Sequence, residues 1–141
     1  MFKTIIVPVD GSTGSERILL FAEHVARHNQ AQVIVVHAYA VPAAYAWTEG
    51  YAALLRQLEA IANEVVQDAV DALRAAGVTA SGDVRQGDPV TAILDAVSIH
   101  EGDLIVMGSR GQKVDNVAEA ILGSVSSAVL LRTYCPVLVV P

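Results

Sequence analysis

The segment 10–12, Asp10-Gly11-Ser12, has residue types that could bind a nucleoside, and it directly follows the apolar run 4–9. A carboxylate at that point can accept hydrogen bonds from a ribose hydroxyl group or from an adenine amine. An Asp-Gly turn that helps to cap the next helix is an equally good interpretation of the same residues. Asp10 is therefore a candidate ligand-binding residue with a structural alternative.

A second candidate combines Gly108-Ser109-Arg110-Gly111, after another apolar run, with Gly123-Ser124. Glycines let the backbone approach a ligand closely, and a helix that begins at Ser124 would place its partial positive charge beside a phosphate group. Each residue taken singly could instead be a turn glycine or a helix cap. The two glycine-containing segments enclose one long loop. Because long loops tend to be functional, this placement favours an anion site.

A third candidate is the segment His37-Ala38-Tyr39, which follows the run 33–36 and could form a wall beside an adenine ring. A plain connection to the next helix explains it equally well. Tyr39, Tyr45, Trp47 and Tyr51 lie around this connection and could form a ligand lid or a partner surface. We favour an aromatic cluster that covers the end of the long helix.

These candidates are positioned by four short, β-branched runs that no polar residue interrupts, namely 4–9, 33–36, 104–107 and 137–140. Strands that are apolar on both faces are typical of a parallel sheet covered by helices. The weaker segment 79–85 alternates polar and apolar residues, as a half-exposed edge strand does.

The segments between the runs predict helices over 15–28, with a stop at Asn29, and over 54–75. Asp88-Pro89 predicts a capped helix start, and a last helix should begin at Ser124 and end before Cys135-Pro136. Strands and helices thus alternate in a doubly wound parallel α/β sheet, one domain over residues 1–141. Ligands of such sheets bind beyond the carboxyl ends of the strands.

Composition excludes several classes of function. The net charge is −6 and the basic residues are scattered, which argues against nucleic acid and anionic membranes as partners. No apolar run approaches the roughly 20 residues of a membrane helix, so we expect no membrane insertion. With Cys135 as the single cysteine, the chain fits the reducing cytoplasm.

Common catalytic and nucleotide motifs are missing from the sequence. It contains neither G-x-x-x-x-G-K-[ST] nor G-x-G-x-x-G. His24 and His28 share a predicted helix face without a third ligand, so we expect no metal site. No arrangement of residues suggests a nucleophile, and we expect no catalytic residue.

Five segments, in this order, resemble the universal stress protein family over nearly the whole chain. They are Ile6-Val7-Pro8-Val9-Asp10-Gly11-Ser12, Gly87-Asp88-Pro89, Gly108-Ser109-Arg110-Gly111, Leu122-Gly123-Ser124-Val125 and Cys135-Pro136-Val137-Leu138-Val139-Val140. The resemblance implies an adenine-nucleotide-hydrolase-like fold with a five-stranded parallel sheet, order 3-2-1-4-5, and helices on both faces. The first and fourth strands would then be neighbours, with Asp10 close to Gly108.

The resemblance also implies an ATP site, since nucleotide-binding members carry the pattern G-x2-G-x9-G-[ST]. By that analogy Gly108, Gly111, Gly123 and Ser124 hold the phosphates and ribose, with a further hydroxyl contact from Ser126. Asp10 faces the nucleoside, and Val9, Ala38 and Tyr39 lie beside the adenine. The remaining expected site residues are Pro8, Ser12, Met107, Arg110 and Val125.

The chain departs from this pattern, because eleven residues, 112–122, separate Gly111 from Gly123. We expect the two additional residues to bulge into solvent, which leaves the glycines in place. The predicted function is an ATP-binding regulatory protein of the stress response, with or without Mg²⁺, and with hydrolysis slow or absent, at most that of a weak ATPase. The alternative is a nucleotide-free dimeric interaction module of the same fold. In both cases we expect a homodimer, and the resemblance implies that it pairs through the C-terminal strand. A regulatory protein is a further candidate partner.

Overall fold

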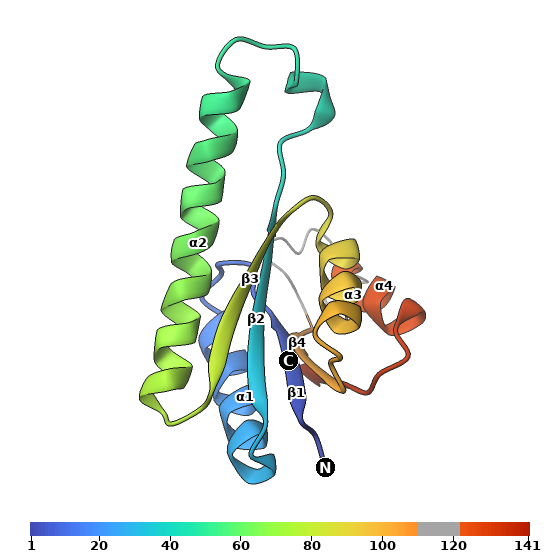
Figure 1. Ribbon diagram of the computed structural model, residues 1–141. Helices are drawn as coiled ribbons and strands as arrows, with labels where there is room; N and C mark the ends of the chain where they lie inside the picture. Colours follow the sequence, from blue (N-terminus) through green and yellow to red (C-terminus); the bar gives the residue numbers. More distant parts are fainter. Residues whose placement is uncertain (110–121) are drawn as a thin grey trace.

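The computed structural model describes residues 1–109 and 122–141, and its centre is one parallel sheet with strand order β3-β2-β1-β4-β5. This order confirms the expected doubly wound topology (Figure 1). The register places Ile5 beside Leu104 and Ile6 beside Ile105, so β1 and β4 are neighbours. The strands are β1 (Thr4–Pro8), β2 (Gln32–Tyr39), β3 (Ala80–Gln86), β4 (Leu104–Gly108) and β5 (Val137–Val140).

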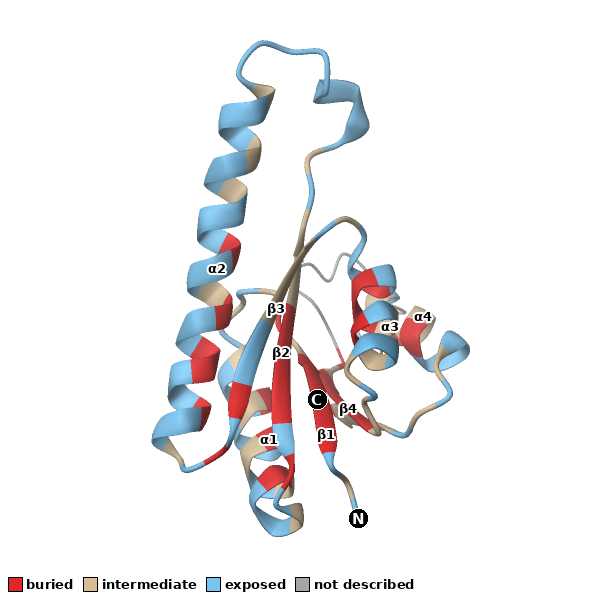
Figure 2. Ribbon diagram, in the orientation of Figure 1, coloured by how far each residue is buried: buried red, intermediate tan, exposed pale blue. Residues whose placement is uncertain are grey.

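Helices cover both faces of the sheet, so that α1 and α2 pack on one face and α3 and α4 on the other (Figure 1). Each face has its own apolar core, and the two cores meet at the buried central strands β1 and β4 (Figure 2). Strands that are apolar on both sides are therefore buried between two layers of helices, as their composition predicts. The helices are α1 (Ser15–Asn29), the short 3₁₀ helix η1 (Ala43–Tyr45), α2 (Tyr51–Ala75), α3 (Pro89–Ile99) and α4 (Ser124–Arg132).

Local signals at helix ends are confirmed with small shifts. The Asp88 carboxylate accepts a hydrogen bond from the Thr91 backbone N–H at 2.9 Å, with Pro89 in the first helical position. Helix α4 begins at Ser124 as predicted. Helix α1 continues through Asn29, and Gln30 adopts the left-handed conformation that ends it, one residue later than expected.

The region between β2 and the middle of α2 differs most from expectation. Strand β2 does not end at Val36, because His37, Ala38 and Tyr39 pair with β3 beyond the end of β1. The first half of α2 and η1 project past the sheet (Figure 1). Trp47 is 93% exposed and Tyr45 is 54% exposed, so these rings do not form the expected packed cover over the helix. In residues 1–109 and 122–141, no helix is both long enough and apolar enough to cross a membrane.

Candidate functional site

A cavity of about 310 Å³ lies at the carboxyl ends of β1 and β4, where the strand order reverses. This is the position at which open parallel sheets bind their ligands, and the volume is at the lower end of the range for small-molecule sites. Eight of the expected site residues line it: Pro8, Val9, Asp10, Ser12, Met107, Gly108, Val125 and Ser126. The topology thus brings together segments that lie about a hundred residues apart in the sequence.

Asp10 forms one wall of the cavity and also shapes the turn that follows β1. Its carboxylate accepts a hydrogen bond from the Ser12 backbone N–H at 2.9 Å. Gly11 has a φ of 80°, a left-handed conformation that favours glycine. The turn is therefore confirmed, but Asp10 does not cap α1, whose N-cap is Gly14 without a side-chain hydrogen bond. Asp10 also lines the cavity, and its contact with a ligand stays a prediction.

The opposite wall joins the end of β4 to the start of α4. The Gly123 N–H donates a hydrogen bond to the Ser109 carbonyl, and the Ser126 hydroxyl donates one to the Gly108 carbonyl. Val125 and Ser126 line the cavity, so the first turn of α4 is at its edge. Since the first backbone N–H groups of a helix have no acceptor inside it, this edge carries a partial positive charge.

Other expected site residues lie elsewhere. Ala38 and Tyr39 belong to the part of β2 that extends along β3, and neither lines the cavity. Gly123 and Ser124 lie at the tip of α4, adjacent to the lining residues but not among them. Arg110 and Gly111 lie outside the described residues, as does the expected bulge except for Leu122.

The cavity also has lining residues that the sequence did not predict. The most informative is Arg17, from the first turn of α1, which is the only basic side chain among the described lining residues. It is a possible counter-charge for an anion in a protein of net charge −6. Its position one turn after the Asp10-Gly11-Ser12 loop is the sequence signal that could have found it. The other additional residues are Gly14, Ile18, Pro89, Ile93, Ser109, Val140 and Pro141.

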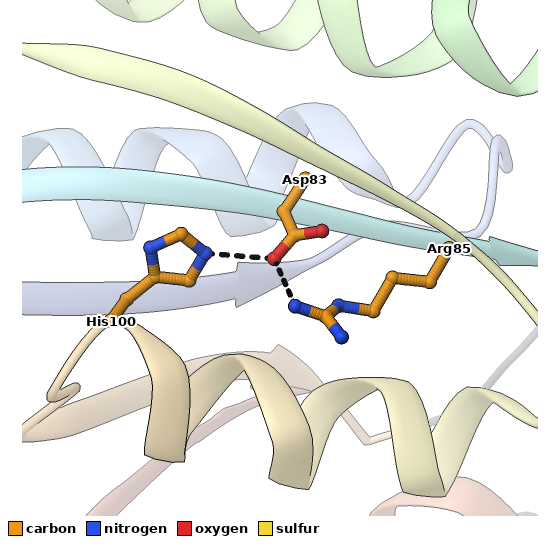
Figure 3. A network of polar contacts seen from close by, with 3 residues as sticks. All are labelled: Asp83, Arg85 and His100. Carbon is orange, nitrogen blue, oxygen red and sulfur yellow. Dashed lines mark hydrogen bonds and ion pairs between the residues drawn. The ribbon is translucent and has the colours of Figure 1, made fainter.

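A separate polar cluster lies on the edge strand β3 (Figure 3). The Asp83 carboxylate is 2.8 Å from the Arg85 guanidinium and 2.7 Å from Nε2 of His100. Burial raises the pKa of Asp83, but the hydrogen bonds and charges of Arg85 and His100 together outweigh it, so the pKa lies below the usual 3.8. None of the three lines the cavity at β1 and β4. In the described part of the chain, no group of three or more acidic, histidine or cysteine side chains could hold a metal ion.

The comparison with protein families decides the relationship that these features suggest. The family model described as the universal stress protein family matches residues 1–141. The chain belongs to this family. A universal stress protein of Thermus aquaticus is 38% identical to it over 147 residues, covering 99% of both chains.

Solved structures of similar fold agree with this membership. The structure of the hypothetical protein MJ0577 superposes with a TM-score of 0.86 at 27% identity, covering 99% of this chain and 96% of that one. A universal stress protein solved in complex with cAMP has a TM-score of 0.77 and 26% identity, covering 99% of this chain and 97% of the other. The fold class of the family is therefore shown for this chain, and one similar structure contains an adenine nucleotide.

Proposed function

We propose that this chain is a cytoplasmic regulatory protein of the stress response that binds an adenine nucleotide, ATP, at the ends of β1 and β4. The observation that carries the proposal is the cavity that joins Asp10, Gly108 and the first turn of α4. The cAMP complex of a universal stress protein 26% identical to this chain supports the same class of ligand.

The two kinds of wall in the cavity suit the two ends of a nucleotide. Apolar side chains, among them Ile93 and Met107, offer a surface for the purine ring. Asp10 can accept a hydrogen bond from a ribose hydroxyl group. The N-terminus of α4 and the Arg17 guanidinium supply the positive charge that phosphate groups require.

We expect hydrolysis to be slow or absent. Asp10 has the only acidic side chain among the described lining residues, and it already accepts the Ser12 N–H that forms the turn. No histidine or lysine stands among those same residues to act as a general base. A Mg²⁺ ion that accompanies ATP would be held largely through phosphate oxygens and water, as this ion commonly is.

Equilibrium dialysis with ATP and with adenosine tests the proposal. Wild type should bind ATP saturably, and Gly123→Val should weaken binding because it adds bulk at the tip of α4. Arg17→Ala should weaken ATP binding by at least about tenfold, because a hydrogen bond to a charged group is worth about 1.5–3 kcal/mol, and should leave adenosine unaffected. Arg27→Ala, farther along α1 and outside the cavity, is the matched control. Absence of saturable binding, or binding indifferent to Gly123→Val, would contradict an ATP site here.

A second candidate function, a nucleotide-free dimeric module, is favoured by β5. This strand is the end of the sheet, and all four of its residues are apolar. Leu131 and Tyr134, just before it, are almost fully exposed. An open apolar edge invites pairing with another strand, so we propose a homodimer through β5, with or without nucleotide, and a protein partner as a further ligand of the dimer. A monomeric mass by light scattering at micromolar concentration would exclude this dimer.

A further inference from the structure

A second cavity, also of about 310 Å³, lies on the other side of the loop that follows β1. It is formed between the start of α1 and the second half of α2, where the loop passes beside that helix (Figure 1). Val9 and Ser12 line both cavities, so the same loop separates them. Nothing in the proposed nucleotide site uses the remaining walls of this second cavity.

The charges of the second cavity are all of one sign. Glu16 from α1 and Asp68 from α2 line it, and no lysine, arginine or histidine does so among the described residues. Neither carboxylate has an ion-pair partner within residues 1–109 and 122–141. Two unpaired carboxylates on facing elements attract a cation and repel a phosphate group.

Ser15 adds an unsatisfied hydrogen-bonding group to the same wall. Its Oγ is buried and has no hydrogen-bond partner in the described part of the chain. An unmade hydrogen bond of a buried hydroxyl group is unfavourable. Ser15 lines the cavity, so a donor on a bound molecule could satisfy this oxygen.

The remaining lining is apolar and includes Leu19, Val65 and Ala69. We propose that this second cavity binds a small organic cation, a primary ammonium group on a short apolar stem. The ammonium group donates hydrogen bonds to Glu16, Asp68 and Ser15, and the stem lies against the aliphatic side chains. The two cavities then sort ligands by charge, because Arg17 lines only the first and the carboxylates of Glu16 and Asp68 line only the second.

Titration of ¹⁵N-labelled protein with pentylammonium chloride, followed by ¹H–¹⁵N NMR, tests this site without any nucleotide present. We expect saturable shifts of the amide signals of Ser15, Glu16 and Ala69. The double variant Glu16→Gln/Asp68→Asn should weaken binding by at least about fivefold, as expected when two exposed charge pairs are lost together. The uncharged probe 1-pentanol should likewise bind wild type at least about fivefold more weakly.

Two controls locate the binding. Glu59→Gln/Glu64→Gln removes the same charge from exposed positions of α2 outside the cavity and should leave binding unchanged. Gly123→Val alters the edge of the first cavity and should also leave it unchanged. The proposal is overturned if binding of pentylammonium does not saturate, or if the Glu16/Asp68 variant binds it as tightly as wild type does. It is also overturned if wild type binds 1-pentanol as tightly as pentylammonium. Loss of binding in Gly123→Val would place the amine in the first cavity and overturn it as well. Because ATP is absent, these results do not depend on whether the first cavity binds a nucleotide.

Discussion

The two edge strands of the sheet, β3 and β5, differ in how far charged side chains protect their unpaired backbone groups. An edge strand exposes unpaired backbone groups that can pair with another chain. On β3 the Asp83 and Arg85 side chains place charge at the edge, and their link to His100 ties that edge to the end of α3 (Figure 3). On β5 the residues are Val137, Leu138, Val139 and Val140, with no charge at all.

The hydrogen bonds between β4 and β5 show which backbone groups of β5 point away from the sheet. The Ile105 N–H bonds to the Pro136 carbonyl, and the Ser109 N–H bonds to the Val140 carbonyl. Because strand residues alternate in direction, the N–H and carbonyl groups of Val137 and Val139 face away from β4. Within residues 1–109 and 122–141, this side of β5 pairs with no strand, so its backbone donors and acceptors are available for a partner.

A protected edge and an open edge in one sheet suggest that only the open edge serves assembly. Proteins commonly place charge on edges that must stay unpaired, and β3 follows that practice. The difference between the edges therefore supports the proposed homodimer through β5 and predicts that β3 takes no part in it.

Val139→Pro is expected to have the largest effect on this comparison. It removes an N–H that faces the free side of β5 and leaves the hydrogen bonds to β4 in place. Two copies of the change in a symmetric strand pair remove two hydrogen bonds, a loss of at least about 2 kcal/mol, so dimerisation should weaken by at least about 30-fold. Sedimentation velocity at micromolar concentration should show a monomer.

The matched control lies on the other edge. The Gly87 N–H bonds to the Tyr39 carbonyl, so the N–H of Gln86, by the same alternation, faces away from β2. Gln86→Pro should leave the protein dimeric in the same sedimentation experiment. A monomer produced by Gln86→Pro, or a dimer that survives Val139→Pro, would remove the distinction between the two edges.

The next largest effect is expected for stability, from a substitution where α2 packs against β3. A Cβ atom at position 82 would collide with Cγ1 of Val66, so α2 packs directly on the strand backbone. Gly82→Ala should lower the free energy of unfolding by about 1–3 kcal/mol, as overpacked substitutions do. Urea denaturation measures the change.

A double-mutant cycle makes this prediction specific. In the background of Val66→Ala, which removes the colliding methyl group, Gly82→Ala should cost much less. Ser81→Ala, an exposed neighbour, should change stability by less than about 0.5 kcal/mol. Equal losses with and without Val66 would mean that α2 does not press on this edge.

The sequence predicted those parts of the fold that depend on local chemistry. The cap at Asp88-Pro89 and the apolar strands needed only their own residues and immediate neighbours, and the structure confirms them. The extension of β2 was not predicted, because His37, Ala38 and Tyr39 become strand only through pairing with β3. Nothing within that tripeptide distinguishes a strand from the start of a loop.

The same limit applies to the candidate site. The convergence of Asp10 and Gly108 follows from the strand order, which the family resemblance implied and the structure shows. Arg17 was missed because an arginine on the surface of an amphipathic helix usually faces solvent. In the structure it is exposed, with its guanidinium carbon 5.8 Å from the centre of the Phe21 ring, and it also lines the rim of the cavity.

The smallest expected effect concerns the charges that protect β3. Asp83→Asn should lower the free energy of unfolding at neutral pH by about 1–2 kcal/mol, because the charged hydrogen bonds from Arg85 and His100 are weakened. The folded pKa of Asp83 lies below its ordinary value of 3.8, so the stabilisation is present above that pH and is lost as the pH falls through the folded pKa. Wild type and variant should therefore differ at pH 6 and converge as the pH is lowered from about 4 toward 2. Urea denaturation along this pH series, with Asp95→Asn on the exposed side of α3 as control, measures the convergence. If the two curves stay parallel over the whole series, the cluster does not stabilise the edge through the Asp83 charge, and shielding by α2 alone must distinguish β3 from β5.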